Sequence, residues 1–168
     1  NQKGVDINQI NNAGWTPLNS AANKGHTEIV QMLLNQEGID INQRNDSGWT
    51  PLNNAADEGL TESVRLLLEQ EGVDVNQGTN DGITPLISAV AHGNREMVLM
   101  FLNDERVEKN SATFEERSPL MQAIYENQID IALMFLQRGI GINSVTEWFR
   151  IDKSRPKGRI LCYQHALA

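Results

Sequence analysis

The chain has 168 residues, of which 39% are apolar and 21% are charged, and it carries a formal net charge of −8. Its dense aliphatic clusters exclude a disordered chain, and no apolar run approaches the roughly 20 residues that a membrane span needs. The negative charge argues against a reader of nucleic-acid phosphates as the main role.

One pattern recurs along the chain with a spacing of 34 residues. A hydroxyl residue, a proline and a leucine open each copy, two apolar residues follow, and a glycine or an asparagine closes the first half. The opening triplets are Thr16-Pro17-Leu18, Thr50-Pro51-Leu52, Thr84-Pro85-Leu86 and Ser118-Pro119-Leu120. Such repetition indicates stacked units, each of which hides its apolar face against the next.

Each copy predicts two short helices and a loop, as the first copy illustrates. Thr16 is a good N-cap, and Pro17 suits the first helical position. Gly25 can take the left-handed conformation that ends the first helix, and Thr27 opens the second. The residues expected to be buried are Leu18, Ala21 and Ala22 in the first helix and Ile29, Val30, Leu33 and Leu34 in the second. Residues 38–48 are turn-rich and predict a β-hairpin-like loop.

The register divides most of the chain into four repeats. These are residues 12–45, 46–79, 80–113 and 114–143. Residues 1–11 are expected to be the end of a preceding repeat, because Asn8 matches the asparagine that closes each later copy. Repeat four has Glu116 in place of the hairpin glycine and Asn127 in place of the helix-ending glycine, so we expect it to be the least regular unit.

The last segment, residues 144–168, leaves the register. Two interpretations stay open: a basic inserted loop followed by a partial fifth-repeat helix, or a linker into another domain. The basic run at residues 150–159 is interpreted as a solvated loop, with contact to an anionic surface or to nucleic acid as the alternative. Cys162 and His165 stand three residues apart, but a thiol nucleophile also needs an orienting acid and an oxyanion site, and the sequence shows neither.

These residues together resemble the ankyrin repeat, whose units open with T-P-L-H-x-A and join a turn to two helices. The resemblance covers about residues 5–143. It implies an all-α repeat fold, an α-solenoid of helix-turn-helix units joined by β-hairpin-like loops. The family's histidine after T-P-L is Asn19, Asn53, Ile87 and Met121 here. Asparagine can still bond to the neighbouring backbone, whereas isoleucine and methionine cannot.

The resemblance also implies a concave groove lined by the hairpin tips, the residue before each Thr-Pro step and the ends of the first helices. The candidate partner-binding residues are therefore Asn12, Trp15, Asn23, Lys24, Asp46, Ser47, Trp49, Asp57, Glu58, Asn80, Asp81, Ile83, His92, Arg117, Tyr125 and Glu126. Trp15 and Trp49 would form an aromatic ladder suited to a binding hot spot; the alternative is that each packs across the adjacent loop. Acidic side chains dominate the remainder and favour a basic or amphipathic partner segment.

The sequence favours a protein–protein interaction module that binds a partner protein through its hairpin tips and concave helix face. The alternative is a structural or targeting scaffold that packs against an adjacent domain, catalytic or not, of a larger protein. His26 is expected to be structural, because it matches the family's usual Gly-His opening of the second helix.

No enzymatic activity, catalytic residue, cofactor, metal or small-molecule substrate is predicted, because the chain has no metal-spaced Cys/His cluster and no phosphate-binding glycine loop. The single cysteine fits a reducing compartment. The 18 asparagines are similar to the composition of effectors secreted by intracellular bacteria. The expected location is therefore cytoplasmic, or the host cytosol for such an effector.

Overall fold

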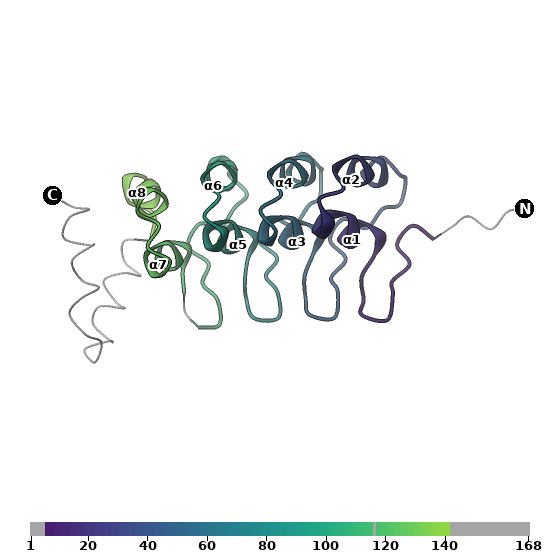
Figure 1. Cartoon of the computed structure of the whole chain (residues 1–168), viewed down its shortest axis with the longest axis horizontal. Coiled ribbons are helices and arrows are strands. Elements are labelled where there is room, and N and C mark those ends of the chain that lie inside the picture. Colours follow the sequence, from purple (N-terminus) through teal and green to yellow (C-terminus); the bar gives the residue numbers. More distant parts are fainter. Residues whose placement is uncertain (1–5, 116, 142–168) are drawn as a thin grey trace, which may run out of the picture.

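The computed structural model describes residues 6–115 and 117–141, and the helices within them form two rows (Figure 1). The inner row lies next to the loops and holds α1 (Pro17–Lys24), α3 (Pro51–Asp57), α5 (Pro85–His92) and α7 (Pro119–Tyr125). The outer row holds α2 (Thr27–Leu34), α4 (Thr61–Leu68), α6 (Arg95–Asn103) and α8 (Ile129–Gln137).

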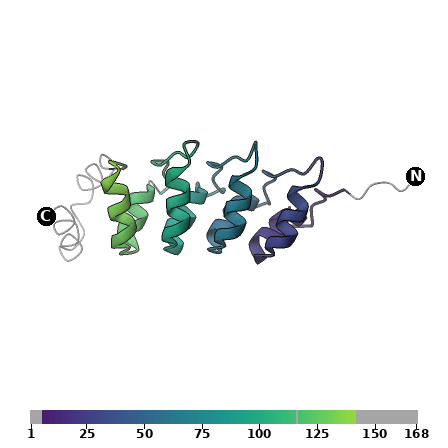
Figure 2. The same cartoon turned by 90° about the horizontal axis from the view of Figure 1, so that it is seen from above.

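Each inner helix packs against the outer helix that follows it, and the resulting pairs stand side by side along the chain (Figure 2). We number the repeats one to four after these pairs. No strand occurs in the described residues, so the connecting loops are hairpin-like in course without being sheet. The predicted all-α repeat solenoid is confirmed.

The inner helices begin where their sequences predict. Thr16, Thr50, Thr84 and Ser118 each accept a hydrogen bond from the backbone N–H three residues further on, and a proline is the first residue of each helix. In the first two repeats the asparagine three residues after the cap bonds back to the cap, which completes a capping box. These caps satisfy backbone donors that a short helix otherwise leaves unpaired.

The inner helices are followed by a residue with left-handed backbone. It is a glycine in three repeats, as at Gly25 with φ of 67°, and Asn127 with φ of 57° in repeat four. Asparagine visits this conformation more readily than other non-glycine residues. The substitution therefore leaves the helix pair of repeat four intact, and the other predicted irregularity, Glu116, lies outside the described residues.

Two buried asparagines tie each repeat to the next, as predicted. Asn19 Nδ2 donates to the carbonyl oxygen of Trp49 at 3.1 Å, and Asn53 Nδ2 donates to that of Ile83 at 3.3 Å. The isoleucine and methionine at this position in repeats three and four are buried in the apolar interior instead. At this position the first two repeats therefore make a polar contact to the next repeat, and the last two place an apolar side chain in the core.

The apolar core runs along the stack instead of surrounding one centre. Leu18, Ala21 and Ala22 are buried as predicted. Small side chains allow helices to approach closely, and the inner helices pack against one another more extensively than the outer helices do. The outer helices contribute the largest buried side chains, Phe101 and Phe135.

One part of the predicted core is wrong. Val30 and Leu34 on α2 are buried and Leu33 is half-buried, but Ile29 is 46% exposed. The later outer helices each have an outer helix before them, whereas α2 has no described helix on that side (Figure 1). The periodicity of α2 marks a face for burial, and in the described residues nothing covers part of that face.

The C-terminal segment, residues 142–168, lies outside the described residues. The two interpretations of it, a partial fifth-repeat helix or a linker, therefore stay predictions. The same holds for the basic run at 150–159 and for Cys162 and His165.

Gly48 lies beside the hairpin tip of repeat two, where the next tip approaches closely. Its φ is 82°, and a Cβ there would lie 2.6 Å from the backbone nitrogen of Asn80. We expect Gly48→Ala to lower the free energy of unfolding for two reasons: the strain of a left-handed alanine and the collision of the added carbon with the next repeat. The collision alone should cost about 1 kcal/mol or more. Urea unfolding measures the change.

Gly72→Ala is the matched control for this substitution. Gly72 has φ of 81°, but no atom lies within 4 Å of the place that a Cβ would take there, so the substitution introduces the strain without the collision. That strain alone is worth about 1–2 kcal/mol. Equal losses at Gly48 and Gly72 would contradict the close contact between hairpin tips.

Candidate partner-binding surface

The hairpin tips, residues 12–13, 46–47, 80–81 and 114–115, form a ladder along one edge of the stack. One backbone hydrogen bond joins each tip to the next: Asp46 N to Ala13 O at 3.2 Å, Asn80 N to Ser47 O at 3.1 Å, and Phe114 N to Asp81 O at 3.2 Å. The predicted tip residues Asn12, Asp46, Ser47, Asn80 and Asp81 are all exposed. Their positions are therefore set by neighbouring repeats while their side chains face solvent.

The tips are also shaped from within by a side chain that precedes each turn. Asn45 Oδ1 accepts from the backbone N–H groups of Ser47 and Trp49, both at 3.0 Å, and Asn11 Oδ1 accepts from those of Ala13 and Trp15. Such Asx turns hold a loop without a sheet. They bring each tryptophan to the foot of its hairpin loop.

The residues at these feet form the Trp row, defined as Trp15, Trp49, Ile83 and Arg117. All four are half-buried. The indoles are therefore neither sealed in the core nor fully solvated, because part of each side chain packs on the scaffold and part faces solvent.

In repeat four, the Trp row contacts the end of the inner helix. The Arg117 guanidinium carbon lies 4.6 Å from the centroid of the Tyr125 ring, a cation–π distance. Tyr125 is the last residue of α7 and is 48% exposed. The repeat register gives Asn23 and Asp57 the same relation to Trp15 and Trp49. In repeat four the Trp row and the end of the inner helix thus meet on one surface.

The helix ends form a second line, the helix-end stripe, defined as Asn23, Lys24, Asp57, Glu58, His92, Tyr125 and Glu126. Its members come together across repeats: Asn23 Nδ2 donates to Glu58 Oε1 at 3.1 Å, and the His92 ring lies against Gly59. Asn23 is half-buried and the others are exposed. The hairpin tips, the Trp row and the helix-end stripe together are called the inner surface.

Asp57 occupies an electrostatically unfavourable place in this stripe. Although the side chain is exposed overall, partial desolvation of its carboxyl group raises the pKa, and the neighbouring Glu58 carboxylate adds to the effect. The Ser88 hydroxyl and the His92 side chain act in the opposite direction without cancelling it. Asn54 Nδ2, on the same helix, is buried without a hydrogen-bond partner among the described residues. Polar groups here are less well satisfied than in the hairpin loops.

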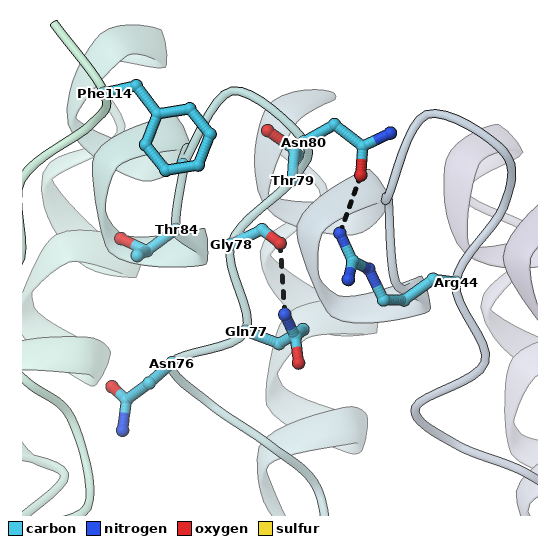
Figure 3. Close-up of a pocket in the computed structure, with 9 residues that line it drawn as sticks. Arg44, Asn76, Gln77, Gly78, Thr79, Asn80, Thr84 and Phe114 are labelled. Atoms are coloured by element: carbon cyan, nitrogen blue, oxygen red, sulfur yellow. Dashed lines mark hydrogen bonds between the residues drawn. The ribbon is translucent and has the colours of Figure 1, made fainter.

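A surface pocket of about 530 Å³ lies beside the hairpin tips of repeats two to four (Figure 3). Arg44 lies at one end, where it donates to Asn80 Oδ1 at 2.9 Å, and the Phe114 ring lies at the other. Phe114 is 78% exposed. The open floor between them includes Gly78 and Gly82, which have no side chains to fill it.

Sequence reasoning missed Arg44 and Phe114. The 34-residue register puts Phe114 at the position of Asn12, Asp46 and Asn80, so the signal was present in the sequence. Arg44 stands one residue before the side chain that builds the turn, and its role depends on Asn80 in the next repeat. A pattern within one repeat does not show that contact.

The two histidines considered in the sequence analysis occupy different kinds of position. His92 ends α5 and lies on the inner surface, as expected. His26 is the N-cap residue of α2, but its side chain is exposed and makes no capping hydrogen bond. Its contribution is made by the backbone, whose N–H donates to Ala21 O at 3.0 Å.

Across the described ranges, no group of three or more His, Cys, Asp or Glu side chains is arranged to hold a metal ion. In the same ranges no helix has the length and apolar character needed to cross a membrane.

The family model for ankyrin repeats in three copies matches residues 2–79 and 71–146. The chain belongs to the ankyrin repeat family. Ankyrin repeats are in general protein-interaction modules, and this ankyrin array has the paired helices and projecting loops of that family in each described repeat.

The chain is also similar to part of one curated mammalian protein. It is 61% identical over 31 residues to the SMC5-SMC6 complex localization factor protein 1 of Mus musculus. The match spans 18% of this chain and 3% of that protein, which is close to the length of one repeat. It supports the repeat and does not extend to the rest of the relative.

Proposed function

We propose that this ankyrin array binds a partner protein through its inner surface. The supporting observation is the contact of Arg117 with Tyr125, because it brings the Trp row and the helix-end stripe together in repeat four. Half-exposed indoles beside exposed polar side chains are favourable material for a protein interface. The scaffold beneath is made of capped helices and tied loops, so little ordering is needed on binding.

The partner segment that fits this surface is basic and amphipathic. Five of the candidate residues are acidic, namely Asp46, Asp57, Glu58, Asp81 and Glu126, and two are basic, Lys24 and Arg117. Cationic side chains of the partner would meet the carboxylates, and its apolar side chains would cover Trp15 and Trp49. Complementary charge of this kind raises the association rate and discriminates against acidic partners.

The alternative is a structural or targeting scaffold that packs against an adjacent domain of a larger protein, in which case the partner belongs to the same polypeptide. The mouse relative is named as a localization factor of a protein complex. Because the match is about one repeat long, it supports the repeat and transfers no particular partner.

Capture from a lysate with matched baits tests the proposal. The first bait is the native chain, and the second carries Asp57→Asn and Glu58→Gln on the inner surface. The control bait carries Glu28→Gln and Glu96→Gln, which remove the same charge from exposed positions on the outer helices. We expect basic proteins to be retained by the native and control baits and lost from the second. Identical captured sets from all three baits would contradict binding through the inner surface.

The pH dependence of stability should reveal the raised pKa of Asp57. A raised pKa means that the folded chain holds the Asp57 proton more tightly than the unfolded chain does, so ionisation of Asp57 destabilises the fold as pH rises above its ordinary value of 3.8. We expect Asp57→Asn to raise the thermal midpoint at pH 7, with a smaller gain at pH 4. Calorimetry at the two pH values measures this, and a gain that grows on acidification would contradict the raised pKa.

A further inference from the structure

The outer helix of repeat one exposes apolar side chains on the side away from the rest of the stack. Ile29 is 46% exposed and Met32 is 67% exposed on α2. Two large apolar side chains three residues apart lie on one helix face. Charged residues are the usual occupants of such exposed positions.

The equivalent positions in the later repeats are covered. At the Ile29 position the residues are Ser63, Met97 and Ile131, which are 1%, 0% and 3% exposed. At the Met32 position they are Leu66 and Met134, which are 7% and 5% exposed, and the half-buried Met100. The same face of the outer helix is therefore an interface between repeats wherever a neighbour is present.

Comparison of the two ends of the outer row shows which neighbour does the covering. The described outer helices contact in the order α2–α4, α4–α6 and α6–α8, so α8 has a described outer neighbour only before it, and α2 only after it (Figure 1). Ile131 and Met134 on α8 are buried, whereas Ile29 and Met32 on α2 are exposed. The face in question is therefore covered by the preceding outer helix.

Residues 6–11 already have the geometry of a loop that closes a repeat. Asn8 Nδ2 donates to Gly38 O at 2.8 Å, and Asn8 Oδ1 accepts from Asp40 N at 2.9 Å. Asn42 makes the same two bonds one repeat further on, to Gly72 O and Asp74 N, both at 2.8 Å. Residues 6–11 thus contact repeat one in the same way as the loop around Asn42, which closes repeat one, contacts repeat two.

We propose that the exposed face of α2 is a docking interface for one further ankyrin repeat, whose closing loop is residues 6–11. The docked loop sets the position of that helix pair, and its outer helix would cover Ile29 and Met32 as α2 covers the equivalent positions on α4. This interface is separate from the inner surface and does not depend on the proposed partner.

Extension of the chain tests the proposal. A copy of residues 46–73, which hold α3, α4 and the turn after them, is joined in front of Asp6 in place of residues 1–5. This keeps the register, because Asp74 and Asp6 are two repeats of 34 residues apart. We expect the thermal midpoint of the extended chain to exceed that of the native chain by at least about 5 °C.

The double variant Ile29→Glu/Met32→Glu makes the test specific. It should change the midpoint of the native chain by less than about 2 °C, since both residues are exposed, and it should remove the gain from the extended chain. Glu28→Lys is the control: the residues at its position in later repeats, Glu62, Glu96 and Asp130, are all exposed, so the gain should survive.

Three results would overturn the proposal. The first is an extended chain that is no more stable than the native chain, and the second is a gain that persists in the double variant. The third is a native chain that sediments as a dimer and reverts to a monomer in the double variant, because the face would then be an interface between two copies.

Discussion

The Leu67→Ala variant is expected to unfold with a free energy about 2–5 kcal/mol lower than that of the native chain. Leu67 is fully buried on α4, and its truncation removes apolar contacts and leaves a cavity that the neighbouring helices cannot fully close. Because α4 packs against α2, α3 and α6, the cavity lies at the junction of three repeats.

The substitution should destabilise the neighbouring repeats as well as repeat two. Helices of seven to nine residues are too short to stand alone in water, so each depends on its neighbours. In a linear array, weakening one interface weakens the cooperative unit that spans it. Urea unfolding followed by far-UV circular dichroism should show an earlier and broader transition than in the native chain.

Met32→Ala is the control for this prediction. It also truncates a large apolar side chain on an outer helix, but Met32 is 67% exposed, so the loss should stay within about 0.5 kcal/mol. Losses of the same size in the two variants would contradict a core that is shared between repeats.

The features that sequence predicts well here are those specified by a few consecutive residues. Thr16 and Pro17 determine the start of α1, and Gly25 determines its end, because capping and left-handed backbone depend on local chemistry. Asn127 departs from this pattern and is expected to make repeat four irregular, yet it adopts the same left-handed backbone as the glycines. The buried asparagine bonds were predictable because each copy meets the same neighbouring backbone 30 residues on.

The features that sequence did not reveal depend on which repeats are adjacent. Ile29 has the periodicity of a buried residue, and its exposure follows from the uncovered face of α2. The pKa of Asp57 is raised by desolvation of its carboxyl group and by the Glu58 carboxylate, and Ser88 and His92 of the next repeat lower it only in part. That the Trp row and the helix ends share a groove is implied by the family resemblance and not by any local pattern, and the contact of Arg117 with Tyr125 brings the two together in repeat four.

The double variant Trp15→Ala/Trp49→Ala is expected to weaken partner binding by about 100-fold or more. Aromatic hot spots lose about 2 kcal/mol or more each when truncated, and about 1.4 kcal/mol corresponds to a tenfold change in affinity. The two indoles occupy equivalent positions in adjacent repeats, whose packed helices lie about 10 Å apart. One amphipathic segment of the partner can therefore contact both. Isothermal titration against a partner captured by the native chain measures the loss.

Stability must be measured with affinity, because both indoles are half-buried and also pack on the scaffold. A modest fall in thermal midpoint accompanied by lost binding supports an interface role. Ile29→Ala/Met32→Ala, which removes exposed apolar side chains from α2, should leave affinity unchanged. If the tryptophan variant unfolds at a much lower temperature but its folded fraction binds as tightly as the native chain, the indoles pack the hairpin loops and the partner contacts other residues. The two roles can be separated because each indole is only partly buried: a partner gains affinity from the exposed part of the side chain, and the scaffold gains stability from the buried part.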